Sequence, residues 1–165
     1  IVWIGSQSTS KYLNVIKETI KSLNQQNIQF VIIGPYKLDF KFKNLKVIPW
    51  KLKTYKKILS KSHVGIMPLD NTIWERGKCG YKILQYYSYG LPAIVSPIGF
   101  NKEIINENIT GYFVRKKSDW YKYIFFLNNN KLKAKQMGNK GYFFLKKNFN
   151  FVQWSKKYSK IFRNL

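Results

Sequence analysis

Short apolar runs alternate with segments of helical periodicity along this chain, and this alternation limits the fold more than any other feature. Six runs have the length and composition of buried strands: residues 1–5, 29–33, 45–48, 63–67, 92–96 and 111–114. Parallel strands need long crossover connections, which are usually helices. We therefore predict an α/β fold, a doubly wound, six-stranded parallel sheet with helices on both faces.

Helical patterns fill the connections between these runs. Apolar spacing predicts an amphipathic helix over residues 10–25 and further helices near residues 55–59, 83–87, 102–106 and 120–127. A last amphipathic helix is predicted at residues 150–165, with an apolar stripe of Phe151, Trp154, Tyr158, Ile161 and Phe162. We expect one domain at residues 1–149, and a last helix that either packs on it or crosses to a neighbouring domain.

The formal net charge is +23, and lysine supplies 27 of the 30 basic residues. Lys, Asn, Ile, Phe and Tyr together account for 85 of 165 residues, a composition typical of A/T-rich genomes. Proteins that bind nucleic acid favour arginine, whose planar fork binds phosphate and guanine through two hydrogen bonds. We therefore attribute most of the charge to codon composition. A basic module that binds nucleic acid or an anionic membrane is the alternative.

Several classes of site and segment are excluded by composition. Cys79 is the only cysteine and His63 the only histidine, so neither an intrachain disulfide nor a thiolate or histidine metal cluster is expected. No apolar run reaches the roughly 18 to 20 residues that a membrane span needs. The chain opens on an apolar run without a Met, and we interpret it as the interior of a longer protein.

In an open parallel sheet, ligands bind beyond the carboxyl ends of the strands, near the switch in strand order. The loop that starts with Gly5 and Ser6 leads into a helix, so its amides are candidates to hold an anion; a plain strand-to-helix turn is equally consistent. Gly99, after the fifth run, either lets a ligand approach or closes a turn.

The loop after the fourth run is long and precedes a helix. Lys78, Lys82 and Gln85 follow at helical spacing and are predicted to share one face. Two lysines and a helix N-terminus directed at one cleft suit a diphosphate. A solvated lysine face is the alternative, because lysine is abundant throughout the chain.

The run RGKCGYKILQYYSYGLPAIVSPIGFNKEII, followed by ENITGYFV, a Trp in DWYKYIFFL and QMGNKGYFFLKKNF, resembles the C-terminal domain of family 4 (group 1) retaining glycosyltransferases with the two-domain GT-B architecture. The opening IVWIGSQSTSKYL and the segment SHVGIMPLD are similar to the first and fourth strands of that domain. The resemblance implies a Rossmann-like domain at residues 1–149 that binds a nucleotide-diphosphate sugar. It also implies retaining sugar transfer without a metal or other cofactor, with the acceptor domain missing from this sequence.

Roles for particular residues follow from the resemblance. The family's pair of glutamates maps onto Gly77 and Gln85, neither of which is acidic, and Glu75 lies near the first position. Lys78 and Lys82 are expected to be the catalytic residues, because lysines beside a departing diphosphate stabilise its growing charge in the transition state.

The resemblance completes the donor-binding set. Arg76 or Lys11 would assist at the diphosphate, and Trp50 would either stack on the nucleobase or fill core. The expected donor-binding residues are Gly5, Ser6, Trp50, Glu75, Arg76, Gly77, Gln85 and Gly99.

Sugar-nucleotide 2-epimerases share this architecture, but they would need an acidic, Ser- and Gly-rich loop where this chain has residues 96–100. We therefore place the transferase first. The family's common setting implies surface glycan or lipid-linked saccharide synthesis. We expect a cytoplasmic protein, with peripheral contact at the inner membrane leaflet through residues 120–126 or the tail as a further hypothesis, and no nucleic-acid partner.

Overall fold

The computed structural model describes residues 1–163, apart from the side chain of Gln153. Six strands form one all-parallel sheet in the order β3-β2-β1-β4-β5-β6. The strands are β1 (Val2–Ile4), β2 (Phe30–Gly34), β3 (Leu45–Pro49), β4 (Gly65–Met67), β5 (Ala93–Val95) and β6 (Gly111–Phe113). Each overlaps its predicted run, and the doubly wound, Rossmann-like parallel sheet is confirmed.

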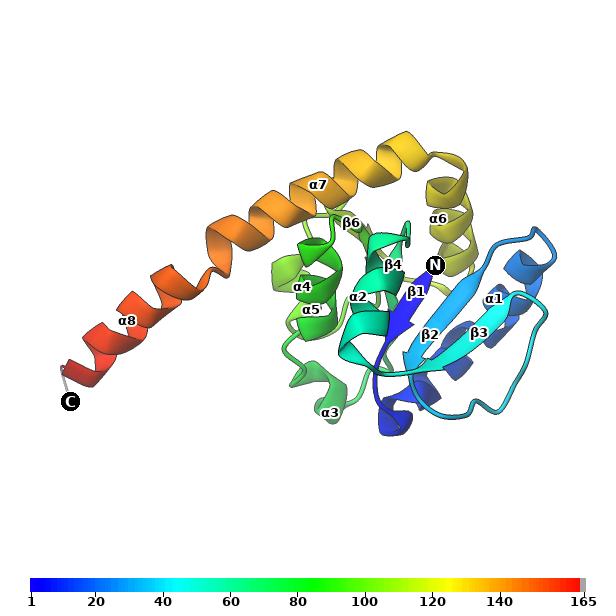
Figure 1. Ribbon diagram of the computed structural model, residues 1–165, viewed down its shortest axis with the longest axis horizontal. Helices are drawn as coiled ribbons and strands as arrows, with labels where there is room; N and C mark the ends of the chain where they lie inside the picture. Colours follow the sequence, from blue (N-terminus) through cyan, green and yellow to red (C-terminus); the bar gives the residue numbers. More distant parts are fainter. Residues whose placement is uncertain (164–165) are drawn as a thin grey trace.

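Helices cover both faces of the sheet, as predicted (Figure 1). One face carries the 3-10 helix η1 (Gln7–Ile16) with α1 (Lys17–Asn24) and α6 (Lys117–Asn129). The other carries α2 (Leu52–Ser60), α4 (Tyr81–Ser88) and the short α5 (Asn101–Ile104). Because side chains alternate across a strand, Trp3 of β1 joins the first core while its neighbours Val2 and Ile4 join the second.

The predicted helix over residues 10–25 is present but starts earlier and changes type. Its first ten residues form η1, and only residues 17–24 are α-helical. The hydroxyl of Thr9 donates to the carbonyl of Ser6, and that of Ser10 to the carbonyl of Gln7. These bonds to carbonyls three residues back match the tighter 3-10 repeat.

The helix α7 (Lys131–Asn148) packs on α4, and glycines as well as large apolar side chains make the contact. A Cβ at Gly138 would lie 1.7 Å from the carbonyl oxygen of Gly90, and one at Gly141 would lie 2.5 Å from the ring of Tyr87. The two helices therefore approach each other at a distance that only glycine permits.

The last helix, α8 (Phe151–Arg163), extends away from the rest of the chain (Figure 1). Its apolar side chains stay exposed, with Phe151 at 85% and Phe162 at 71% of their surface in solvent. The predicted helix is present, but it does not pack along residues 1–149; residues 164 and 165 of the predicted range lie outside the described part. None of the described helices has both the length and the apolar content needed to cross a bilayer.

Candidate functional site

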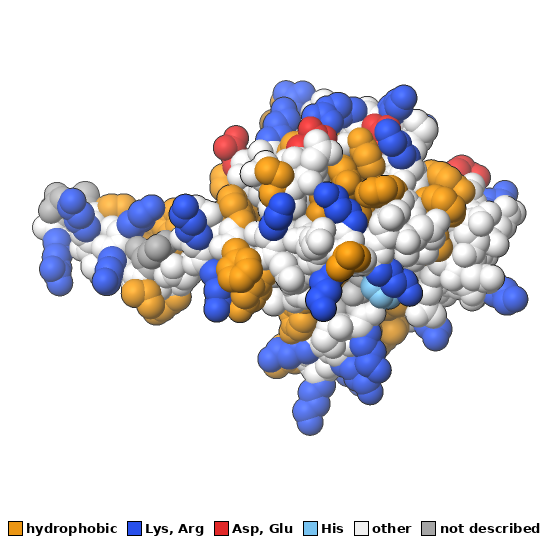
Figure 2. All heavy atoms as spheres, turned by 90° about the horizontal axis from the view of Figure 1, so that it is seen from above, with side chains coloured by type: hydrophobic (Ala, Val, Ile, Leu, Met, Phe, Trp, Pro, Cys, Tyr) orange, Lys and Arg blue, Asp and Glu red, His pale blue; other side chains and the backbone are white. Residues whose placement is uncertain are grey.

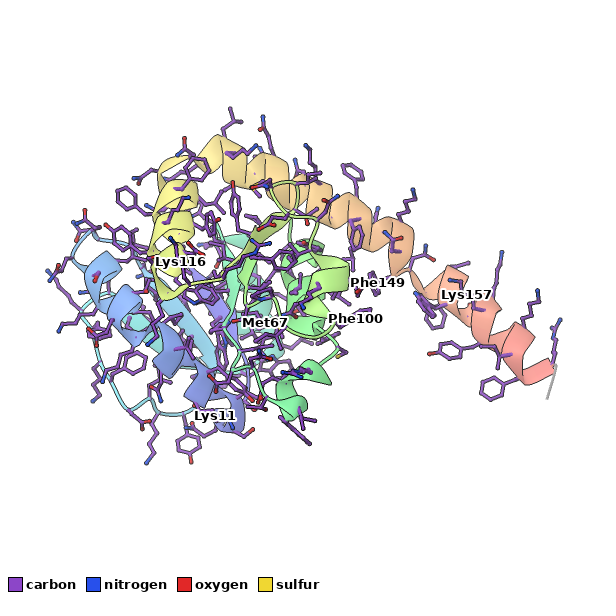
Figure 3. The ribbon with its side chains drawn as sticks, turned by 180° about the vertical axis from the view of Figure 1, so that it is seen from behind. Lys11, Met67, Phe100, Lys116, Phe149 and Lys157 are labelled. Atoms are coloured by element: carbon purple, nitrogen blue, oxygen red, sulfur yellow. The ribbon has the colours of Figure 1, made fainter. Side chains whose placement is uncertain are left out.

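A pocket of about 440 Å³ opens where the strand order reverses, between β1 and β4. Gly5, just after β1, and Met67, the last residue of β4, line it at the carboxyl ends of these strands. Figure 3 shows Met67 near the centre of the domain, with Lys11 of η1 and Phe100 beside α5 on either side in this view. The switch point predicted to hold the ligand is therefore hollowed.

Four more of the predicted site residues line this pocket: Gly77, Lys78, Lys82 and Gln85. Lys82 and Gln85 lie on α4, as predicted, whereas Lys78 lies in the turn before this helix. The turn is tight because Gly80 adopts a φ of +67°, and a Cβ there would lie 2.5 Å from the side chain of Ile104. This glycine places the first residue of α4 at the pocket.

The two lysines are held against aromatic rings. The ammonium of Lys82 lies 5.7 Å from the centroid of Trp3, which is buried in β1. The ammonium of Lys78 lies 5.3 Å from the centroid of Tyr12 and 5.9 Å from that of Trp74. All three distances are within the range of cation–π attraction.

The electrostatic field in the pocket is positive. Burial, and then the charge of Lys78, lower the pKa of Lys82. Among the described residues that line the pocket none is acidic, and the N-terminus of α4 has no side-chain cap. An anion in this pocket would therefore meet two ammonium groups and the positive end of a helix dipole.

Glu75 does not reach the pocket. It belongs to the short helix α3 (Ile73–Arg76) and is 2% exposed, and its carboxylate accepts hydrogen bonds from the hydroxyls of Tyr12 and Thr72. These bonds lower the pKa of Glu75, and burial raises the pKa of Tyr12 to about 12. The sequence predicts a contact between Glu75 and the donor. In the structure, both carboxylate oxygens of Glu75 instead accept hydrogen bonds from residues inside the protein.

Two other expected donor residues are held elsewhere by local contacts. The Nε of Arg76 donates to Oδ1 of Asn71 over 3.0 Å, so its guanidinium is tied to its own loop. Gly99 has a φ of +53°, and a Cβ there would lie 2.3 Å from the carbonyl oxygen of Arg76. The positive φ fits the turn considered for Gly99, and the group that closely approaches this glycine is the backbone at the end of α3.

Ser6 and Trp50 also lie outside the residues that line the pocket. The Ser6 hydroxyl lies 2.8 Å from that of Ser8, within the turn that starts η1. Trp50 is 53% exposed after β3 and stacks on Tyr55 with centroids 6.0 Å apart, so it is not a core residue. Lys11 lies 5.2 Å from the Tyr12 ring centroid and does not line the pocket either.

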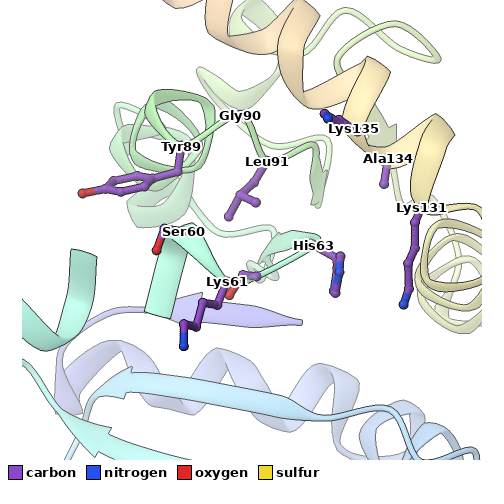
Figure 4. Close-up of a pocket in the computed structure, with 10 residues that line it drawn as sticks. Ser60, Lys61, His63, Tyr89, Gly90, Leu91, Lys131, Ala134 and Lys135 are labelled. Carbon is purple, nitrogen blue, oxygen red and sulfur yellow. The ribbon is translucent and has the colours of Figure 1, made fainter. Parts of the chain in front are cut away.

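A second cavity, of about 560 Å³, lies at the opposite edge of the sheet (Figure 4). Its walls include Ser60 and Lys61 at the end of α2, His63 before β4 and Lys131 at the start of α7. None of the residues expected to bind a donor lines it. The expected site residues that line the pocket between β1 and β4 are Gly5, Gly77, Lys78, Lys82 and Gln85.

Sequence reasoning missed Tyr12, Trp3 and Thr72 as supports of the site. Tyr12 and Trp3 are predicted only as apolar core residues, and the bond between Tyr12 and Glu75 joins positions 63 residues apart. No local pattern reveals such a contact.

A model of the family described as glycosyl transferases group 1 matches residues 1–127. The chain belongs to this family. The resemblance to its GT-B members is confirmed by solved structures that share the fold. A search of curated protein sequences found no significant match.

Three solved structures illustrate the likeness. HepE of Anabaena, in complex with UDP and glucose, has a TM-score of 0.81 at 10% identity over 99% of this chain and 48% of its own. A glycosyltransferase of Rickettsia africae has a TM-score of 0.81 at 15% identity over 99% and 47%. The C-terminal domain of LpcC from Francisella tularensis has a TM-score of 0.68 at 15% identity over 91% and 86%.

The chain spans about half of HepE and 34% of TarM, another structure with the same fold. At these identities the likeness establishes the fold alone. In LpcC this fold is that of the C-terminal domain of a glycosyl transferase group 1 family protein.

Proposed function

We propose that this chain is the donor-binding half of a retaining glycosyltransferase, and that the pocket between β1 and β4 binds a nucleotide-diphosphate sugar. The observation that carries the proposal is the convergence of Lys78, Lys82 and the N-terminus of α4 on a pocket at the switch point. Membership of the group 1 family supports it, as does the UDP bound by HepE.

The proposed chemistry follows from the leaving group. When the sugar departs, the nucleotide diphosphate gains negative charge, which Lys78 and Lys82 stabilise more in the transition state than in the ground state. Gln85 offers a neutral amide to a ribose hydroxyl. Gly77 leaves space at the pocket wall, because a Cβ there would meet only the carbonyl oxygen of Trp74, at 3.6 Å. The reaction we propose needs no metal.

No general base is assigned within this chain. In the proposed enzyme such a group belongs to the missing N-terminal domain, which also binds the acceptor. We therefore expect the isolated chain to bind the donor without transferring sugar.

We propose that α8 crosses to that missing domain. Phe151, Tyr158 and Phe162 leave 85%, 55% and 71% of their surface exposed on a helix that projects from the sheet (Figure 1). Burying such a stripe against a second domain would remove its apolar surface from water.

The proposed setting is surface glycan or lipid-linked saccharide synthesis on the cytoplasmic side of the membrane. Exposed Tyr121 and Phe126 beside Lys122 on α6 support peripheral contact with anionic lipid, whereas Trp120 is buried and takes no part. Sedimentation with anionic vesicles at moderate salt tests this contact, and a chain that stays in the supernatant would contradict it.

A basic nucleic-acid module is the function to be tested against this proposal. On the face seen in Figure 2, Lys and Arg side chains are spread among other residues rather than gathered in one patch. The experiment is a titration of the purified chain with UDP, GDP, ADP and a short DNA duplex at two salt concentrations, followed by Trp fluorescence. Saturable binding of one nucleotide supports a donor site. Salt-sensitive binding of DNA alone would overturn the proposal.

A further inference from the structure

Glu75 is a buried carboxylate without a basic partner at ion-pair distance. The single ion pair among the described residues joins Arg115 to Glu107, although the chain has 30 basic side chains. Glu75 is satisfied by two hydroxyls instead, with Tyr12 bonded to Oε1 and Thr72 to Oε2. A buried carboxylate is costly unless it is hydrogen-bonded, so this arrangement must be fully made whenever the site is formed.

Glu75 and Tyr12 both contact Lys78, Glu75 at its main chain and Tyr12 at its ammonium group. The main-chain N–H of Lys78 donates to the carbonyl oxygen of Glu75 over 3.1 Å. Its ammonium lies over the ring of Tyr12, which is 3% exposed and therefore fixed by its surroundings. The hydroxyl of that ring is in turn bonded to the Glu75 carboxylate.

Lys78 needs such anchors because its own segment is short. It lies in the turn between α3 and α4, with Gly77 before it and Gly80 two residues after it. Glycine has a wide choice of backbone conformations, so this turn does not by itself fix the direction of a long lysine side chain. Tyr12 comes from η1, and it ties the turn to the segment that follows β1.

We infer that Tyr12 and Glu75 are positioning residues that hold Lys78 at the donor pocket, although neither lines that pocket. The inference rests on the proposed function for the identity of the ligand. Tyr12 fixes the ammonium through its ring, and Glu75 fixes both the ring and the main chain of the turn. A defect in either residue is expected to appear as weaker diphosphate binding.

The first test compares UDP affinity in the wild-type chain, Tyr12→Phe and Tyr87→Phe. Tyr87 is a matched control, because it is also buried and its hydroxyl donates to Thr110 over 2.6 Å, and it does not line the pocket. We expect Tyr12→Phe to bind UDP several-fold more weakly, because the ring beneath the Lys78 ammonium is no longer fixed by Glu75, and Tyr87→Phe to match the wild type. Equal affinity in all three, or equal losses in both variants, would overturn the inference.

The second test needs no ligand, so it separates this inference from the proposed function. The methylene protons next to the Lys78 ammonium are expected to resonate upfield in the wild type, because they lie near the face of the Tyr12 ring. Tyr12→Leu is expected to reduce that shift to the part that the Trp74 ring contributes, and Tyr87→Phe to keep it in full. An unchanged shift in Tyr12→Leu overturns the positioning role. If a wild type that shows the shift binds none of UDP, GDP and ADP, that result overturns the proposed function instead.

Discussion

The ammonium of Lys82, on α4, lies 5.7 Å from the ring centroid of Trp3, on β1. The contact joins the strand at the switch point to the helix that follows β4. The position of the Trp3 ring also explains why residue 5 is a glycine, because a Cβ there would lie 2.2 Å from that ring. One buried aromatic residue thus determines both where the lysine lies and why the pocket wall after β1 is a glycine.

Loss of the Lys82 charge is expected to weaken nucleotide binding. A hydrogen bond to a charged group contributes about 1.5–3 kcal/mol, so Lys82→Ala should raise the Kd for UDP roughly 10- to 100-fold. The exposed Lys140, on α7, supplies a control, and Lys140→Ala should keep the wild-type Kd. Fluorescence titration measures all three proteins. An unaltered Kd in Lys82→Ala would remove this residue from the site.

Alkaline pH is expected to weaken UDP binding earlier than an ordinary lysine would allow. Burial, and then the charge of Lys78, lower the pKa of Lys82, and the diphosphate favours its charged form. As the pH rises through the lowered pKa, Lys82 loses its proton and the attraction is lost. Lys82→Arg stays charged, so its Kd should change less between pH 7 and 10. Parallel pH profiles for the two proteins would contradict this assignment.

The lowered pKa of Lys82 also makes the stability of the fold depend on pH, and here stability rises with pH whereas UDP binding falls. Below the folded-state pKa of Lys82, the folded chain holds a charged and partly buried group that the unfolded chain leaves in water. This opposition to folding disappears as the pH rises from the folded-state pKa toward the unfolded value. Relative to Lys82→Met, the wild type should therefore gain stability across that alkaline interval, as urea unfolding at each pH would reveal.

The parallel sheet, and the edge of it that holds the pocket, could be predicted because they follow from local sequence patterns. Runs such as residues 1–5 carry no polar side chain, and in a parallel sheet covered on both faces such runs become strands. The order of strands and helices then places Gly5, Lys78 and Lys82 at one edge before any distance is known. All three line the same pocket.

The enclosure of Glu75 and the packing of α7 could not be predicted, because they depend on contacts between residues that are distant in the sequence. The bond from Thr72 to Glu75 spans only three residues, but the bond from Tyr12 to the other carboxylate oxygen spans 63, and no local pattern reveals it. The helix α7 makes part of its packing contact through Gly138 and Gly141, beside Phe144. A pattern search for large apolar residues cannot detect a helix that packs through glycine.

Gly138→Ala is expected to destabilise the fold. Its Cβ would lie 1.7 Å from the Gly90 carbonyl oxygen, which belongs to the backbone and has little freedom to move. Overpacking of this kind costs about 1–3 kcal/mol, a loss of several degrees in Tm. Gly77→Ala is the matched change, because φ is −78° there and the nearest contact is 3.6 Å; it should preserve or slightly raise Tm. Equal melting temperatures for both variants would contradict the close approach of α7 to the backbone of Gly90, in the turn after α4.

Removal of residues 150–165 is expected to leave both the fold and the pocket intact. The helix α8 projects away from the sheet, so its deletion exposes little of the two cores, which are built from residues 1–149 (Figure 1). The truncated chain should match the intact chain in Tm and in Kd for UDP, and it should associate less with itself, because the exposed Phe151 and Phe162 are gone. Calorimetry, titration and sedimentation measure the three quantities. A large fall in Tm would mean that α8 packs on residues 1–149 in solution. Its apolar face would then be part of this domain, and the proposal that it contacts a second domain would be wrong.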